Sequence, residues 1–264
     1  MEIRKIANLE NEEDRVKALY NIFDEESRLK SKAIRVEFLT TVRQIEKYLR
    51  KGMKILDLGA GAGEYSLYFA DKGYAVTAVE LVDHHVDKIK EKKKDDMELV
   101  AFQGTALDLS KFEDKSFDII LCFGPLYHLV EEQDALKCIS EVKRVCKDSG
   151  FMFFAFINND MVILTERMCY NNSLKADYYN HDTFKVKDFP FVFKTVDKAR
   201  EILNKGGAQV IKEIASDGLS ELLEDKINSM DDEEYKLWLN YHFYCCEKPE
   251  YLGTSNHLLF IAKK

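Results

Sequence analysis

The residues best suited to chemistry lie in a glycine-rich stretch at residues 57–63, with the sequence DLGAGAG. Glycine lets the backbone turn sharply and approach a ligand closely. Asp57 places a carboxylate directly ahead of the turn, where it would repel a pyrophosphate and attract an amino group or a positive centre. The dinucleotide-binding motif G-x-G-x-x-G needs a third glycine, and Glu64 stands at that position. The stretch therefore predicts a ligand-binding turn and speaks against a nicotinamide-dependent oxidoreductase.

A second carboxylate, Glu80, ends the next apolar run at residues 75–80. At the end of a strand beside the glycine turn, it can accept hydrogen bonds from both hydroxyls of a ribose, and its charge rejects a 2′-phosphate. Together with Asp57, Glu80 predicts a pocket for a nucleoside that carries an amino group and a positive centre. S-adenosylmethionine fits this description.

The elements that must position these residues alternate between apolar strands and helices. Strands are predicted at residues 54–58, 75–80, 98–103, 117–123 and 151–157, with helices between them. Continuous apolar runs joined by helices are typical of a doubly wound, mainly parallel α/β sheet that is covered on both faces. Ligands bind such a sheet at the carboxyl ends of its strands, where residues 57–63 and Glu80 lie.

The rest of the chain is predicted to attach to this core within a single domain, residues 1–264. Helical periodicity at 11–50 indicates an N-terminal helical cap (1–50) before the cofactor-binding core (51–157). Residues 158–193 break the pattern and form an insertion rich in tyrosine and phenylalanine, which either lines a substrate pocket as a lid or packs onto the core. Residues 194–264 are predicted to add helices at about 195–204, 219–228 and 231–246. Two late strands, 208–214 and 258–262, are expected to form a hairpin-like edge of the sheet.

Residues 55–63 (ILDLGAGAG), with Glu80 closing the next strand, resemble class I S-adenosylmethionine-dependent methyltransferases of the bacterial small-molecule type. Residues 116–129 resemble the fourth-strand motif of that family, and residues 141–147 its passage from helix to strand. The resemblance covers about residues 35–157 and implies a Rossmann-like methyltransferase fold with S-adenosylmethionine as cofactor. The cofactor-binding residues expected from the motifs and from the charge of Asp57 are Asp57, Gly59, Ala60, Gly61, Glu80, Leu81, Thr105, Ala106 and Phe123.

The loop after the fourth strand carries the candidate catalytic residues, Tyr127 and His128. Methyl transfer depends mainly on alignment of the nucleophile and exclusion of water, and a base is needed only when the nucleophile arrives protonated. His128 could deprotonate a hydroxyl or an amine near pH 7, and Tyr127 could turn its ring toward the sulfonium. The alternative is that both residues line the pocket or cap the next helix.

The expected function is methyl transfer to an oxygen or nitrogen of a small molecule. One alternative is a module that binds S-adenosylmethionine without catalysis. Another is methylation of a nucleobase amine, although residues 124–127 (GPLY) keep one proline and the aromatic of such enzymes and lack their Asn or Asp. A net charge of −8 over 264 residues speaks against a nucleic acid as the partner.

The cysteines and the N-terminus bear on compartment and metal content. The 6 cysteines are scattered, and with the histidines they show no spacing typical of a metal site or a disulfide framework, so no metal is expected. The pair His84 and His85 falls on the helix after the second strand and is expected at the surface. Residues 1–13 lack the apolar region of a signal peptide, and no apolar run reaches the length of a membrane span. The expected compartment is the cytoplasm, without a membrane partner, and the oligomeric state stays open.

Overall fold

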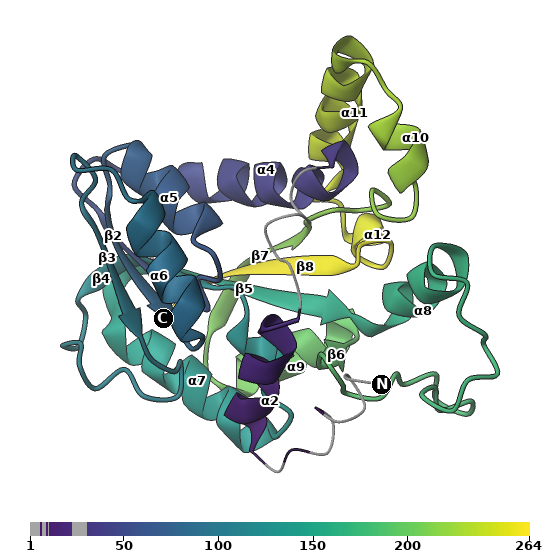
Figure 1. Ribbon diagram of the computed structural model, residues 1–264, viewed down its shortest axis with the longest axis horizontal. Helices are drawn as coiled ribbons and strands as arrows, with labels where there is room; N and C mark the ends of the chain where they lie inside the picture. The colour runs from purple at the N-terminus through teal and green to yellow at the C-terminus, as the bar shows by residue number, and fades with distance from the viewer. Residues whose placement is uncertain (1–5, 7–8, 10, 23–30) are drawn as a thin grey trace.

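The structure is a computed structural model that describes residues 6, 9, 11–22 and 31–264. Its centre is an 8-stranded sheet in which seven strands follow the order β3-β2-β1-β4-β5-β8-β7, while β6 pairs with β5 off this path (Figure 1). The strands are β1 (Lys54–Leu58), β2 (Ala75–Glu80), β3 (Leu99–Gln103), β4 (Phe117–Cys122), β5 (Cys146–Asn158), β6 (Phe193–Lys194), β7 (Gln209–Ala215) and β8 (His257–Lys263).

Strands β1 to β6 pair in parallel, whereas β8 runs antiparallel to both of its neighbours, β5 and β7. The predicted doubly wound, mainly parallel sheet is thus confirmed, and the late pair β7 and β8 forms its edge as expected. Since β8 runs antiparallel to β5, it begins beside the carboxyl end of β5, and β7, antiparallel to β8, ends there too. The end of β7 and the start of β8 therefore lie level with the carboxyl ends of the parallel strands. That edge gathers the residues that follow β1, β2, β3, β4 and β7.

Helices cover the sheet on both faces, which explains why its strands are apolar throughout. On one face, α4, α5 and α6 pack against a core that includes Phe38, Ile55 and Phe69. On the other face, α7 and α9 pack against a core that includes Leu56 and Ile139. These helices are α4 (Lys32–Glu46), α5 (Glu64–Asp71), α6 (Asp83–Lys92), α7 (Glu132–Val145) and α9 (Val196–Lys205).

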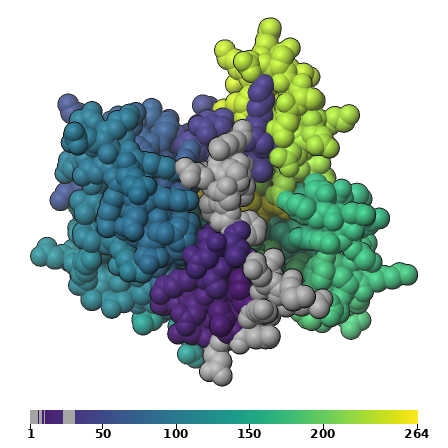
Figure 2. All heavy atoms as spheres, viewed as in Figure 1, coloured from purple at the N-terminus to yellow at the C-terminus, as the bar shows by residue number. Residues whose placement is uncertain are grey.

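The helical cap contains α4 and a shorter helix, α2 (Glu12–Tyr20). Asn11 caps α2 and Ser31 caps α4 by accepting hydrogen bonds from backbone amides of the first turn. Residues 23–30, which the sequence placed within this cap, lie outside the described residues. Figure 2 shows α2 in purple on the front of the molecule, between the blue core and the green insertion.

The insertion and the C-terminal part contain elements that the sequence pattern did not reveal. The insertion begins with α8 (Asn159–Met168), and its apolar residues Tyr179, Val186 and Phe193 form a small core with Ile157. The predicted helix at 219–228 is shorter in the structure, since α10 spans Glu224–Asn228. It is followed by α11 (Asp232–Cys245) and by a short helix, α12 (Pro249–Leu252). Among the described residues, no helix combines the length and apolar character that a membrane crossing requires.

Candidate active site

A cavity of about 530 Å³ opens at the carboxyl ends of β1, β2, β3 and β4. Its size lies within the range of small-molecule sites. Among its lining residues are all of the predicted cofactor-binding and catalytic residues except Asp57: Gly59, Ala60, Gly61, Glu80, Leu81, Thr105, Ala106, Phe123, Tyr127 and His128. Residues that the sequence analysis selected from four separate segments therefore line one cavity.

Glu80 and the glycine loop are bonded to each other. The Glu80 carboxylate accepts a hydrogen bond from the Gly61 amide (2.8 Å) through Oε2 and another from the Val82 amide (2.9 Å) through Oε1. Glu80 is 6% exposed, so these charge-assisted bonds lie where water competes little. These bonds fix the carboxylate between the loop after β1 and the start of α6. Glu80 also lines the cavity, where its two oxygens can accept further hydrogen bonds from a ligand.

Two glycines of the loop are required by close approaches of the backbone. Gly59 has φ +72°, and a Cβ atom there would lie 2.9 Å from Cδ of Pro125. Gly63 has φ +88°, and a Cβ atom there would lie 2.6 Å from Cγ1 of Ile89 in α6. Gly61, by contrast, has open space at its Cβ position. The loop thus packs tightly at both ends and exposes backbone to the cavity in its middle.

Asp57 differs from its predicted role, because it lies behind the loop rather than in the cavity wall. Its side chain is 1% exposed and accepts a hydrogen bond from Oγ of Ser66 (2.6 Å) in α5. Burial raises the pKa of Asp57 to about 7, against the hydrogen bond from Ser66, while the nearby charge of Glu80 adds to the rise. Asp57 therefore ties the end of β1 to α5, and the predicted direct contact with an amino group does not fit this position.

His85 corrects a second expectation from the sequence. The pair His84-His85 was expected on the surface of the helix after β2, but His85 is 2% exposed and lines the cavity. Its Nδ1 lies 3.9 Å from Oε1 of Glu80, and its ring contacts the ring of Tyr20 edge-on at 5.6 Å. Helical spacing offers a signal for this, since His85 falls on the same face of α6 as the buried residues Val86 and Ile89, but a polar residue is not counted in an apolar pattern.

The loop after β4 forms a short 3-10 helix, η1 (Pro125–Tyr127), which ends at His128. Nε2 of His128 is 2.9 Å from the hydroxyl of Tyr20. Its Nδ1 is buried beside the Pro190 carbonyl without the geometry of a full hydrogen bond. Burial lowers the pKa of His128 to about 4, so the imidazole is neutral at pH 7, and its tautomer decides whether Nε2 donates or accepts the hydrogen bond with the Tyr20 hydroxyl. His128 as a base stays a prediction, and the contact with Tyr20 is the role the structure displays.

Tyr127 lines the cavity and is supported from the insertion. Its carbonyl accepts a hydrogen bond from the Val192 amide (2.9 Å), and its ring lies edge-on to Phe191 at 6.2 Å. Among the described lining residues, none comes from residues 158–193. The insertion thus packs against the η1 loop on the side away from the cavity. Of the two roles considered from the sequence, packing onto the core fits these contacts, and lining of the pocket does not.

Thr105 lies in the turn after β3 and lines the cavity, but its hydroxyl accepts a hydrogen bond from the Leu107 amide (3.3 Å). The predicted helical cap also contributes to the cavity wall, although the sequence does not say through which side chains. From α2 and α4 come Tyr20, Glu37 and Phe38, and Tyr65 comes from α5. Only the folded chain reveals them, because their positions along helices say nothing of which strand ends they will meet.

Comparison with known proteins identifies this arrangement. A family model described as a methyltransferase domain matches residues 56–154, the segment from β1 to β5. This segment of the chain is similar to a methyltransferase domain, and the fold agrees with that similarity. The cofactor of this domain is S-adenosylmethionine.

Individual relatives of the methyltransferase domain are distant. The chain is 27% identical over 110 residues to the putative methyltransferase YqeM of Bacillus subtilis, a match that covers 42% of this chain and 44% of that protein. It resembles a solved S-adenosylmethionine-dependent methyltransferase from Methanosarcina mazei (TM-score 0.55, 18% identity, 84% of this chain and 96% of that one). It also resembles the PH0226 protein from Pyrococcus horikoshii (TM-score 0.62, 19% identity, 94% and 98%). The chain spans between 42% and 65% of the lengths of the curated relatives it matches.

Proposed function

We propose that this protein transfers a methyl group from S-adenosylmethionine to a nitrogen or oxygen of a small molecule. The observation that carries the proposal is the cavity, which is lined both by the bonded pair Glu80 and Gly61 and by a group of aromatic residues. This aromatic group includes Tyr65, Phe123 and Tyr127. A cavity with room beyond its cofactor-binding residues suits an enzyme that must hold an acceptor as well.

The residues present fit the cofactor. Glu80 offers carboxylate oxygens to ribose hydroxyls, and the open position at Gly61 lets a ligand approach the backbone. When bound, S-adenosylmethionine supplies a methyl group on a positively charged sulfur. The protein's part is to hold the acceptor in line with that methyl group and to keep water away. The rings of Tyr65, Phe123 and Tyr127 suit both tasks, since aromatic faces attract cations and exclude water.

The cap contributes to this enclosure through Tyr20 and His128. Their hydrogen bond joins α2 to the η1 loop, and Oε1 of Glu12 accepts a second bond from the Val130 amide (2.6 Å). Both contacts close α2 over the loop that follows β4. We therefore favour His128 as a residue that positions the cap over the reacting groups, with the base role as the alternative.

The test is titration calorimetry with S-adenosylmethionine and with its demethylated product, S-adenosylhomocysteine. Micromolar binding is expected for the wild-type protein. Glu80→Gln should weaken it by about 10- to 100-fold, because hydrogen bonds to a charged group contribute about 1.5–3 kcal/mol. The control is Glu91→Gln, the same change on the exposed side of α6. Absence of binding by folded wild-type protein would overturn the proposal.

Turnover separates the enzyme from a module that only binds. Purified protein is incubated with S-adenosylmethionine and mixtures of small amines, alcohols and phenols, and mass spectrometry searches for products heavier by one methylene. Tight binding with no product from any class would favour the binding module.

We propose the cytoplasm as the compartment, since all six cysteines are free thiols.

A further inference from the structure

His85 carries a polar atom that the fold leaves without a partner. Its side chain is 2% exposed and lines the cavity from the first turn of α6, the helix that follows β2. Nδ1 of the ring is buried, and it forms no hydrogen bond with any group in the described part of the chain. A buried nitrogen without a partner destabilises the fold, and a ligand that supplies the missing bond recovers that free energy.

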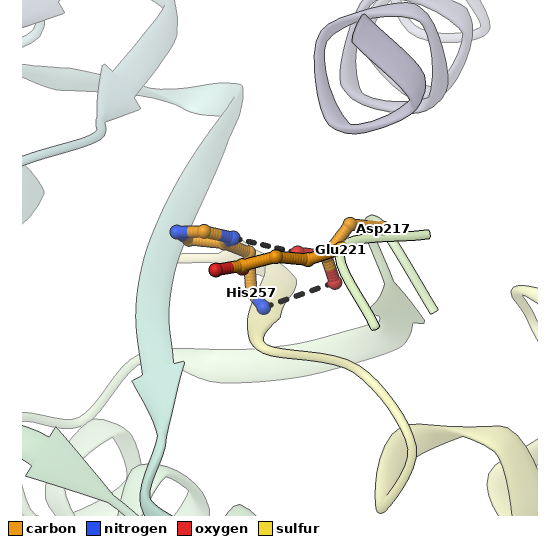
Figure 3. A group of neighbouring side chains, drawn as sticks. All are labelled: Asp217, Glu221 and His257. Carbon is orange, nitrogen blue, oxygen red and sulfur yellow. Dashed lines mark hydrogen bonds and ion pairs between the residues drawn. The ribbon is translucent and has the colours of Figure 1, made fainter. Parts of the chain in front are cut away.

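A second histidine at the same edge of the sheet shows the contrasting case. Nδ1 of His257 and Oδ2 of Asp217 are 2.7 Å apart, the length of a normal hydrogen bond (Figure 3). Glu221 lies beside this pair and accepts a hydrogen bond from Asn256 (2.6 Å). These bonds account for the grouping of Asp217, Glu221 and His257. Their polar atoms are bonded within the fold, whereas Nδ1 of His85 is not.

Nδ1 of His85 lies beside the carboxylate that we expect to bind the ribose. It is 3.9 Å from Oε1 of Glu80, which is too far for a direct hydrogen bond. An oxygen atom that forms hydrogen bonds of about 2.8 Å with two groups at once keeps those groups about 4 Å apart. The distance between Nδ1 and Oε1 therefore suits one hydroxyl bound between them.

The two groups complement each other toward a hydroxyl. A hydroxyl has one proton to donate and lone pairs with which to accept, whereas a carboxylate can only accept. A ribose hydroxyl that gives its proton to Glu80 therefore needs a separate donor for its own oxygen. The negative charge of Glu80 favours the tautomer of His85 that carries its proton on Nδ1, next to the carboxylate. His85 can thus supply the donor that Glu80 lacks.

The position of the His85 ring is set by its neighbours. The ring of Tyr20 contacts it edge-on at 5.6 Å between ring centroids, and the ring of His84 contacts it at 4.4 Å. Val82 accepts a hydrogen bond from the His85 amide (3.1 Å) and donates its own amide to Glu80 (2.9 Å), so one turn of the chain positions both groups. A donor that is in place before the ligand arrives loses little conformational entropy on binding.

We propose that His85 is a specificity-determining residue of the cofactor site, whose Nδ1 donates a hydrogen bond to the ribose hydroxyl from which Oε1 of Glu80 accepts one. The two residues together recognise that hydroxyl both as a donor and as an acceptor. A ligand without this hydroxyl leaves both His85 and Glu80 with an unmade bond. The inference rests on the contact between Glu80 and the ribose in the proposed function.

The test is titration calorimetry of the full-length protein with S-adenosylhomocysteine and with its 2′-deoxy and 3′-deoxy forms. His85→Phe keeps an aromatic ring and removes both nitrogens. This variant should bind S-adenosylhomocysteine about 5- to 10-fold more weakly than wild type, the loss expected for one hydrogen bond in a buried site. The deoxy form that lacks the shared hydroxyl should lose less than about 2-fold, because the bond to His85 is already absent. The other deoxy form should lose as much as the parent compound.

Two further variants separate the hydrogen bond from general effects on α6. His85→Leu also lacks a polar atom and should give the same pattern across the three ligands, so it replaces His85→Phe if that variant does not fold. His84→Phe is the matched control, since it makes the same change at the neighbouring position, which is not among the described lining residues. It should leave all three affinities unchanged.

The outcomes separate this inference from the function on which it rests. Failure of the wild-type protein to bind S-adenosylhomocysteine would overturn both. Equal binding of the parent compound and both deoxy forms by wild type would overturn the ribose contact of Glu80 and the inference with it. Equal weakening of all three ligands by His85→Phe would assign the ring a packing role and overturn the inference alone. Unchanged affinity of that variant for S-adenosylhomocysteine would do the same.

Discussion

Replacement of Asp57 by asparagine should change how stability depends on pH. In the folded protein, burial raises the pKa of Asp57 from 3.8 to about 7. The folded state therefore keeps a proton on this carboxyl at pH values where the unfolded chain has lost it. Stability from this group is fully present below pH 3.8 and is lost as the pH rises through about 7. At about 1.4 kcal/mol for each pKa unit, the loss amounts to about 4 kcal/mol.

The asparagine side chain of this variant would carry no charge at any pH and could still accept the hydrogen bond from Ser66. The free energy of unfolding of Asp57→Asn, relative to wild type, should therefore rise by up to about 4 kcal/mol between about pH 4 and pH 7.5. Urea unfolding of both proteins without cofactor, at half-unit steps of pH, measures this difference. Asp87→Asn, the same change at an exposed position of α6, should leave the difference flat. Parallel profiles for wild type and Asp57→Asn would refute the reasoning.

Two further substitutions test the packing of the loop and the cap. Gly63→Ala should lower the free energy of unfolding by about 2–4 kcal/mol, because its backbone is left-handed and the new Cβ would lie 2.6 Å from Ile89. Gly73 is also left-handed but has open space at its Cβ position, so Gly73→Ala should cost only about 1–2 kcal/mol. Equal losses of the two variants in urea unfolding would contradict this. Tyr20→Phe removes the hydroxyl that forms a hydrogen bond with His128. Amide hydrogen exchange in α2 should then quicken by about 10-fold, and S-adenosylhomocysteine should bind several-fold more weakly. Unchanged exchange would show that this bond does not hold the cap in place.

The sequence predicted the parts of the fold that depend on local patterns. Apolar runs bounded by glycine located β1 to β5, and the chemistry of Glu80 located one wall of the cavity. Asp57 and His85 were misplaced for a common reason. Each is a polar residue on a buried face, and its surroundings depend on which distant helix packs against it.

Contacts between distant segments account for what the sequence left out. Tyr20 meets His128 across 108 positions, and Glu37 of the cap meets His257 at the start of the last strand. The residue pattern within a single helix or strand does not tell which distant segment it will contact. The insertion shows the same limit, because aromatic residues that suit a pocket suit a small core equally well, and the packing of Tyr179 with Phe193 follows only from the folded chain.

The place of β8 in the sheet has a consequence for folding during synthesis. The strands β1 to β5 are made in one stretch, residues 54–158, but β5 receives its antiparallel neighbour only when residues 257–263 have emerged. Until then, the apolar edge from Met152 to Ile157 has no partner on that side and could pair with another chain. Pairing of such distant segments is slow, because a long loop must close first. The nascent protein therefore passes through a period in which its cofactor-binding strands exist and its sheet is still open to aggregation.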